Sequence, residues 1–386
     1  MEFTVVRIEQ IETTMVDIPT VRGHVLSMAT MRVQTAVIVT IRFSDGSVGF
    51  GEGTTIGGLT YGTESPESIV SAINTYLAPA ILGRDGDDVN GSIQLMDRIA
   101  RGNRIAKCAV EIALWDGLGK RMDVSVAQLF GGAVHERLPV AWTLASGNSE
   151  TDVAEAIEMI ETRRHNIFKL KIGKRSVKDD VAHVARIKDA VGDKASIRVD
   201  VNQAWTHTEA RWGLKGLQEV GCELVEQPIS CRYRDAIAEL CRDYEIALMA
   251  DESLNGPEDA LGVVSAAAAD VFAVKVAQSG GLKRASEVIS IGQAAGLGLY
   301  GGTMLETGLG TAAALQLFAT VETLHWGTEF FGPLLLTEEI LTEPITYQDF
   351  CVDVPRGPGI GAELDADKLK FYRRESGLTI KAVAGE

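Results

Sequence analysis

Several patterns that define other classes of protein are missing from this sequence of 386 residues. No charge-free apolar run reaches the roughly 18 residues that a membrane-spanning helix needs. The amino-terminal segment has no basic stretch followed by an apolar one, so we expect no secretory signal peptide. A formal net charge of −16 argues against nucleic acid or an anionic membrane as a partner. A small anionic substrate is not excluded, because a local cluster of lysines and a metal can outweigh the overall charge.

Binding motifs for common cofactors are also missing. No G-x-G-x-x-G follows a predicted strand, which argues against dinucleotide binding, and no His-based zinc motif is present. The five cysteines include no C-x-x-C pair, and we expect them to be reduced thiols in a cytoplasmic protein. What remains is a chain with 46% apolar and 23% charged residues, which is ordinary for a globular protein and long enough for two domains.

The first third of the chain has the pattern of an α+β unit. Residues 1 to about 55 alternate as strands do, and "TAVIVTIRF" and "SVGFGEG" flank a predicted hairpin turn at residues 44–46. Ser65 has the position of a helix N-cap with Pro66 at the first helical position, so we predict a helix over residues 66–82. Apolar residues at helical spacing predict a second helix over residues 104–122.

From about residue 137 the pattern changes to short apolar strands that alternate with amphipathic helical segments. Such alternation favours parallel βα units, and we interpret it as an α/β fold closed into a barrel. An open, doubly wound sheet is the alternative. The eight predicted strands are "LPVAWTL", "IFKLKIG", "SIRVDVN", "CELVEQP", "IALMADES", "VFAVKVA", "GLGLYGG" and "LHWGTEFFG".

Three of these strands end in an acidic residue. Asp200, Glu226 and Asp251 follow one another at intervals of 26 and 25 residues, about the length of one βα unit. Because the carboxyl ends of parallel barrel strands meet at one rim, we expect the three carboxylates to lie together there. A ligand set made only of oxygen atoms suits a hard divalent cation, Mg²⁺ or Mn²⁺, better than zinc.

Lysines on the neighbouring strands extend this pattern. Lys169 and Lys171 lie two positions apart in "NIFKLKIGKRS", so their side chains share one face of the strand. We expect one ammonium group to lower the pKa of the other, so that a neutral amine can take a proton from the carbon next to a metal-bound carboxylate. Lys275, 24 residues after Asp251, is expected to face the same site. On its own, that lysine would equally suit the Schiff-base residue of an aldolase-type barrel.

The segments around these side chains resemble the enolase superfamily, and within it the muconate lactonizing subgroup. The matching segments are "FKLKIG", "RVDVNQAW", "LVEQPI", "MADES", "FAVKVAQSGG", "LYGGTMLE" and "WGTEFFGPLLL". The resemblance covers nearly the whole chain. It implies a modified TIM barrel, (β/α)7β, over residues 134–338 and an α+β capping domain over residues 1–133. The carboxy-terminal segment, residues 339–386, is expected to return to the capping domain.

The resemblance also implies roles for individual residues. The positions that match metal ligands are Asp200, Glu226 and Asp251. The positions that match catalytic residues are Lys171, Lys169, Lys275 and Glu329. Among these, Lys171 matches the acid/base, Lys169 its partner, Lys275 the lysine on the opposite face, and Glu329 a proposed proton donor. The expected substrate-binding positions are Ile56, Tyr61, Thr143, Asn202 and Phe331.

The reaction that the resemblance implies is the reversible conversion of cis,cis-muconate to muconolactone, a step of the β-ketoadipate route of aromatic catabolism. One carboxylate of this small dicarboxylate adds to the conjugated double bond, the metal stabilises the enolate, and Lys171 protonates the α-carbon. The expected cofactor is one Mn²⁺ or Mg²⁺ per subunit. The resemblance also implies a homo-oligomer, with an octamer as the expected form.

Other activities on the same scaffold remain as alternatives. They are chloromuconate cycloisomerisation, N-acylamino acid racemisation, dipeptide epimerisation and o-succinylbenzoate synthesis. The loop "TTIGGLTYG" favours non-halogenated muconate among them. The loop after the seventh strand lacks the histidine of the His-base branch, which argues against a mandelate-racemase-like activity. A binding protein without catalysis is disfavoured, because none of the catalytic positions is substituted.

Overall fold

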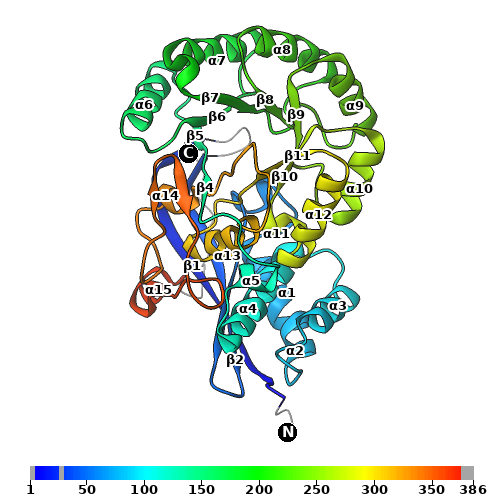
Figure 1. The fold of residues 1–386 in the computed structure, drawn as a ribbon, viewed down its shortest axis with the longest axis vertical. Coiled ribbons are helices and arrows are strands. Elements are labelled where there is room, and N and C mark those ends of the chain that lie inside the picture. The colour runs from blue at the N-terminus through cyan, green and yellow to red at the C-terminus, as the bar shows by residue number, and fades with distance from the viewer. Residues whose placement is uncertain (1–4, 26–29, 375–386) are drawn as a thin grey trace, which may run out of the picture.

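The computed structural model describes residues 5–25 and 30–374, which form a capping domain beside a barrel (Figure 1). The capping domain contains an antiparallel sheet with the order β1-β2-β3, made of β1 (Ile8–Val25), β2 (Thr30–Phe43) and β3 (Val48–Thr54). The predicted hairpin turn at residues 44–46 is confirmed, since Arg42 pairs with Val48 across it. Gly46 has a φ of +85°, which favours glycine at this point of the turn.

Helix α4 (Arg104–Met122), which has the predicted limits, lies unusually close to β3. A Cβ atom at Gly51 would lie 2.0 Å from the carbonyl oxygen of Ala109, and one at Gly49 would lie 2.0 Å from that of Ala113. The alternating glycines of "GFGEG" therefore allow the helix backbone to contact the strand backbone. This contact packs α4 directly against β3.

The predicted helix over residues 66–82 is present but irregular. Ser65 is the N-cap and Pro66 opens α1 (Pro66–Ala72), as predicted. A π-helical turn over Ile73–Leu77 follows, and then α2 (Ala78–Ile81). Pro79 has no backbone N–H to donate, and the wider π-turn just before it adapts the helix to that missing donor.

The barrel is a sheet of seven parallel strands with the order β11-β10-β9-β8-β7-β6-β5. Its strands are β5 (Trp142–Leu144), β6 (Ile167–Lys171), β7 (Ser196–Asp200), β8 (Leu224–Glu226), β9 (Ala247–Ala250), β10 (Val271–Val274) and β11 (Gly298–Gly301). Each lies inside one of the predicted strands. The eighth predicted strand is reduced to Thr328, which makes parallel bridges with Gly301 on one side and Val140 on the other. A closed barrel is thus confirmed, and the open sheet is wrong.

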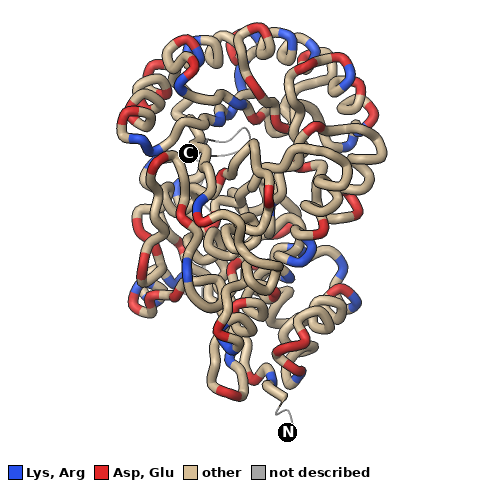
Figure 2. Tube along the Cα trace, in the orientation of Figure 1, with Lys and Arg blue, Asp and Glu red and all other residues tan. Residues whose placement is uncertain are grey.

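Helices cover the outer face of the barrel, as Figure 1 shows. They are α6 (Ser149–Glu161), α7 (Val177–Val191), α8 (His207–Glu219), α9 (Arg234–Asp243), α10 (Pro257–Ala266) and α12 (Leu282–Ala294). Two further helices lie toward the capping domain: α11 (Val276–Ser279) contacts α4, and α13 (Gly308–Phe318) contacts β3. Acidic and basic residues both occur along the outermost of these helices (Figure 2). The remaining helices and single turns are α3 (Val89–Ile99), α5 (Val126–Leu129), α14 (Gly332–Leu335), α15 (Ala366–Tyr372), Gly58–Thr60 and Gly192–Lys194.

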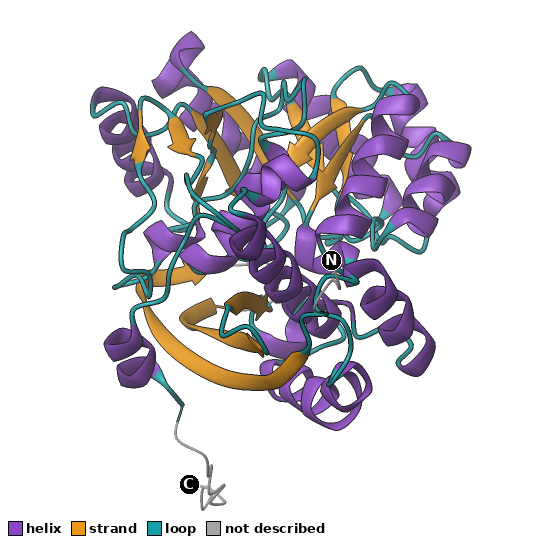
Figure 3. Ribbon diagram, turned by 60° about the horizontal axis from the view of Figure 1, so that its bottom comes forward, coloured by secondary structure: helices purple, strands orange, loops and turns teal. Residues whose placement is uncertain are grey.

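The segment after the barrel runs back to the capping domain. It contributes β12 (Tyr347–Gln348) and β13 (Cys351–Asp353), and β13 pairs with β4 (Arg137–Pro139). Arg373 forms a bridge with Val16 of β1, and the guanidinium of Arg374 lies 2.6 Å from the Asp17 carboxylate. Figure 3 shows the curved strands of the capping domain beside the barrel. The domain limits at 133/134 and 338/339 stay predictions. The described residues contain no helix long and apolar enough to cross a membrane.

Candidate active site

The three predicted carboxylates meet at the rim of the barrel. Asp200 ends β7, Glu226 ends β8, and Asp251 directly follows β9. Asp200 pairs with Glu226 in the parallel ladder, so the two residues leave the sheet at the same level. All three are buried, and one ligand atom from each lies within 4.8 Å of the others.

This donor set fits a hard divalent cation, because it consists of buried carboxylate oxygens. Oδ1 of Asp251 is buried and has no hydrogen-bond partner among the described residues. Burial and the neighbouring Asp200 carboxylate raise the pKa of Glu226 well above its ordinary value. Three acids placed so closely disfavour one another's charge, and a divalent cation between them would relieve that repulsion.

Lys169 and Lys171 of β6 form ion pairs with carboxylates from three other segments of the barrel. Nζ of Lys169 lies 2.6 Å from Oε2 of Glu329 and 2.5 Å from Oε2 of Glu226. Nζ of Lys171 lies 2.6 Å from Oδ2 of Asp200. Both lysines point into the barrel, as the alternation predicts, while Leu170 between them is buried on the other face. The K-x-K motif thus spreads positive charge across a strongly acidic site.

We expected the pKa of Lys171 to be lowered, and this prediction is wrong when only the groups of the protein are considered. Burial lowers the pKa and is the largest single effect, and the Lys169 ammonium lowers it too. The carboxylates of Asp200, Glu329 and Glu226 outweigh both, so the pKa of Lys171 lies above its ordinary value. The pKa of this amine is therefore set mainly by the surrounding acids, and a cation bound to those acids would offset their effect.

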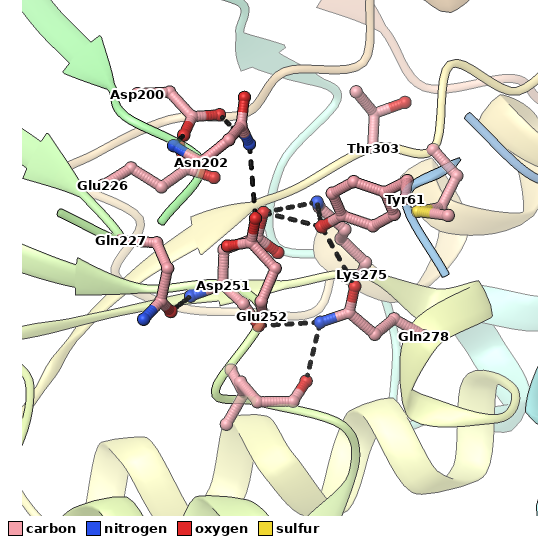
Figure 4. Close-up of polar contacts among 12 residues, drawn as sticks. Tyr61, Asp200, Asn202, Glu226, Gln227, Asp251, Glu252, Lys275, Gln278 and Thr303 are labelled. Carbon is pink, nitrogen blue, oxygen red and sulfur yellow. Dashed lines mark hydrogen bonds and ion pairs between the residues drawn. The ribbon is translucent and has the colours of Figure 1, made fainter. Parts of the chain in front are cut away.

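Lys275 faces the same carboxylates from the other side. It follows β10, and its Nζ lies 2.7 Å from Oδ2 of Asp251 and 2.6 Å from the hydroxyl of Tyr61 (Figure 4). Tyr61 comes from the capping domain, and its hydroxyl donates to Oδ2 of Asp251 at 2.8 Å. The capping loop therefore reaches the acidic cluster directly. Thr143 of β5 donates to Glu329 at 3.2 Å and ties the last strand to the first.

All twelve residues expected from the resemblance line a single pocket between the capping domain and the barrel rim. They are Ile56, Tyr61, Thr143, Lys169, Lys171, Asp200, Asn202, Glu226, Asp251, Lys275, Glu329 and Phe331. The pocket also has three lining residues that sequence reasoning missed: His24, Thr303 and Leu305. His24 lies on β1, more than a hundred residues from the barrel strands, and only its alternation with Arg22 in "VRGHV" could have drawn attention to it.

A fourth residue that sequence reasoning missed, Gln227, positions Asp251 without lining the pocket. Its Oε1 accepts a hydrogen bond from the backbone N–H of Asp251 at 3.1 Å (Figure 4). It also accepts one from the backbone N–H of Ser253 at 3.1 Å. Gln227 has a φ of +37° and Asn202 a φ of +45°, both in the left-handed region that non-glycine residues rarely adopt. Both residues lie just after strands that carry a carboxylate of the acidic cluster.

Glu252, which follows Asp251, does not have the position that regular strand alternation would give it. Alternation predicts that it points to the other face as a structural residue. Instead, its Oε1 accepts a hydrogen bond of 3.4 Å from Asn202, at the edge of the site (Figure 4). The reason is that β9 ends at Ala250, so the two acids lie in a turn where strand alternation no longer holds.

Two family models match the chain. The model of the mandelate racemase / muconate lactonizing enzyme N-terminal domain matches residues 10–131, and that of the enolase C-terminal domain-like family matches residues 151–368. Among solved structures, the muconate lactonizing enzyme from Pseudomonas fluorescens complexed with muconolactone superposes with a TM-score of 0.95 at 49% identity. That likeness covers 96% of this chain and 100% of the other.

Curated relatives agree with the family models. Muconate cycloisomerase 1-1 of Acinetobacter lwoffii is 52% identical over 96% of this chain and 97% of its own length. A chloromuconate cycloisomerase of Cupriavidus necator is 43% identical over 95% of this chain and 99% of its own length. With the barrel, the capping domain and the acidic cluster in agreement, this chain belongs to the mandelate racemase / muconate lactonizing enzyme family of the enolase superfamily.

Proposed function

We propose that this chain catalyses the reversible, divalent-metal-dependent lactonisation of cis,cis-muconate to muconolactone. The observation that carries the proposal is the pocket, which gathers the three carboxylates, three lysines and Glu329 around one buried space. Relatives described as muconate cycloisomerases are 48 to 52% identical to this chain, while those described as chloromuconate cycloisomerases are 41 to 43% identical. The non-halogenated substrate is therefore favoured.

The acidic cluster would hold the cation through Asp200, Glu226 and Asp251. When bound there, a divalent cation supplies positive charge that stabilises the negative charge developing on a substrate carboxylate. Lys169 is fixed by its ion pairs with Glu226 and Glu329, so its ammonium group is held in place to bind a carboxylate. The protein thus presents to a dianion several ammonium groups that are held by ion pairs with its own carboxylates.

Lys171 is the residue we assign to proton transfer. It has a single carboxylate partner, Asp200, whereas Lys169 has two, so its amine is the less restrained of the pair. In the lactonising direction its ammonium group gives a proton to the α-carbon after the second carboxylate has added to the double bond. In the reverse direction the neutral amine takes that proton back.

Epimerisation remains the second candidate, and one observation favours it. Lys171 and Lys275 approach the acidic cluster from opposite sides, from β6 and from the end of β10, as a two-base racemase requires. The Tyr61 hydroxyl and Asp251, however, both hold the amine of Lys275. Lys275 would then bind charge rather than transfer protons.

The test is the ultraviolet absorbance of cis,cis-muconate mixed with the purified protein and Mn²⁺. We expect a metal-dependent loss of the conjugated-diene absorbance, with muconolactone identified by NMR, and no loss after treatment with a chelator. The same assay with a chloromuconate as substrate shows which of the two substrates the protein converts faster. Absence of turnover together with α-proton exchange of N-acyl amino acids or dipeptides in D₂O would overturn the proposal in favour of epimerisation.

Three finer expectations belong to the same proposal. We infer that the ion is Mn²⁺ or Mg²⁺, since the all-carboxylate set suits both, and metal replacement in the assay above separates them. We also infer a homo-oligomer of octameric size, to be measured by light scattering. A cytoplasmic location is inferred from the reaction and would be tested by cell fractionation.

A further inference from the structure

One side chain in the pocket has no part in the reaction described so far. His24 of β1 lines the pocket together with Thr143 and Lys171. Only 1% of its surface is exposed, and its Nδ1 has no hydrogen-bond partner among the described residues. A buried polar atom without a partner is costly, so one that faces a binding pocket indicates a ligand that completes it.

The other polar side chains of the pocket already have partners. Within the described residues, each of them makes at least one hydrogen bond or ion pair with another side chain. Thr143 donates to Glu329 at 3.2 Å, and Asn202 donates to Asp200 at 3.1 Å. The imidazole of His24 therefore has a hydrogen-bonding atom, Nδ1, that no group of residues 5–25 and 30–374 occupies.

Arg22 fixes the strand that carries this imidazole. Arg22 contacts the barrel directly, and His24, two residues later on β1, lines the pocket. Nη1 of Arg22 lies 2.8 Å from Oε2 of Glu155, and Nη2 donates to the carbonyl oxygen of Thr143 at 3.0 Å. The guanidinium also lies over the ring of Trp142, 5.5 Å from its centre. His24 is thus held against the β5 side of the barrel, whereas the acidic cluster lies on β7, β8 and the end of β9.

The imidazole is neutral at physiological pH. Burial lowers the pKa of His24 to about 3, and the nearby charges of Lys171 and Arg22 act in the same direction. A neutral imidazole carries one N–H that can donate to a carboxylate and adds no positive charge to a site that already holds three lysines. It can therefore recognise a carboxylate without changing the charge balance around Lys171.

We propose that His24 binds the second carboxylate of the dicarboxylate substrate, the one that is not placed at the acidic cluster, by donating a hydrogen bond from Nδ1. This inference rests on the proposed function for the class of substrate. It makes His24 a determinant of the preference for dicarboxylates over monocarboxylates. Its contact holds the carboxylate that adds to the double bond.

Calorimetric titration of the Mn²⁺-loaded protein tests this directly, with two saturated probes that cannot react. Adipate carries two carboxylates on six carbons, and hexanoate carries one. Since a hydrogen bond to a charged group is involved, we expect His24→Leu to weaken adipate binding by about tenfold to a hundredfold. Hexanoate binding should stay within about twofold, because it lacks the carboxylate that His24 binds.

Further variants separate hydrogen bonding from shape. His24→Asn places an amide near the position of Nδ1 and should restore most of the adipate affinity, whereas His24→Gln extends beyond it and should restore less. His135→Leu is the matched control, since His135 lies outside the pocket and contacts the carbonyl oxygens of Val321 and Glu322. This control should bind adipate as the unaltered protein does.

Two outcomes would overturn the inference. The first is unchanged adipate affinity in His24→Leu. The second is an equal loss of affinity for adipate and for hexanoate, which would show that His24 contributes only to the shape of the pocket. If His24→Leu does not fold, the comparison of His24→Asn with His24→Gln decides in the same way. No turnover is needed in these titrations, so a failure here is separate from a failure to convert muconate.

Discussion

Glu52 provides a quantitative test of how the capping domain is joined to the barrel. It lies on β3 with 2% of its surface exposed. Its Oε1 accepts from the backbone N–H of Thr307 at 2.9 Å and from the hydroxyl of Thr54 at 2.5 Å. Its Oε2 accepts from the hydroxyl of Thr307 at 2.6 Å and from the N–H of Gly310 at 2.7 Å. One carboxylate of the capping domain thus holds the first turn of α13, next to the loop that lines the pocket.

The change Glu52→Gln converts one of these oxygens into an NH₂ group. The hydroxyls of Thr54 and Thr307 can rotate to accept from it, but a backbone N–H cannot. Either orientation of the amide therefore leaves one buried N–H, that of Thr307 or Gly310, without an acceptor, at a cost of about 1–3 kcal/mol. Loss of negative charge at the amino terminus of α13 adds about 0.5–1 kcal/mol. We expect the free energy of unfolding to fall by about 1.5–4 kcal/mol.

Urea unfolding followed by far-ultraviolet circular dichroism measures this loss. The control is Glu9→Gln, because Glu9 is exposed on β1 and the same chemical change there removes no buried acceptor. The control should lie within about 0.5 kcal/mol of the unaltered protein. A loss of less than about 0.5 kcal/mol for Glu52→Gln would show that its four hydrogen bonds do not stabilise the junction.

Three further predictions concern the site and the capping domain. Lys171→Ala should abolish muconate turnover and leave the circular dichroism spectrum and metal affinity intact; substantial remaining turnover would remove Lys171 from proton transfer. Glu226→Gln should weaken the affinity for Mn²⁺ at least about tenfold by calorimetry, since one charged ligand is lost; unchanged affinity counts against the three-carboxylate site. Gly51→Ala should destabilise the protein by more than about 3 kcal/mol, because the new Cβ meets backbone atoms of α4. Gly53→Ala is the matched case, since its Cβ would lie 3.2 Å from the nearest atom, and it should cost far less.

The barrel and its rim were predictable because their signals are local. Each strand is a short apolar run, and the acids and lysines occur at the carboxyl end of a run, so spacing of one βα unit brings them together. The K-x-K alternation placed Lys169 and Lys171 on the inner face for the same reason. The last strand was predicted as a full strand, but its pairing depends on Gly301 and Val140, which are far away in the sequence.

What could not be predicted depends on contacts between distant segments. His24 enters the pocket because Arg22 binds Glu155 and the Thr143 backbone, across more than a hundred residues. No local pattern encodes such a contact. The pKa of Lys171 was misjudged for a related reason: its sequence neighbour Lys169 is visible in the motif, while the carboxylates that outweigh it come from other strands.

Closure of the barrel through one residue, Thr328, affects how the active site comes apart when the protein unfolds. Thr328 joins β11 to the start of the sheet, and its neighbour Glu329 binds both Lys169 and Thr143. A ladder this short frays more readily than the longer ladders elsewhere in the barrel, so amide exchange should begin there. Each such opening separates Glu329 from its partners while the outer helices remain intact. Heat should therefore inactivate the enzyme before its helical signal declines.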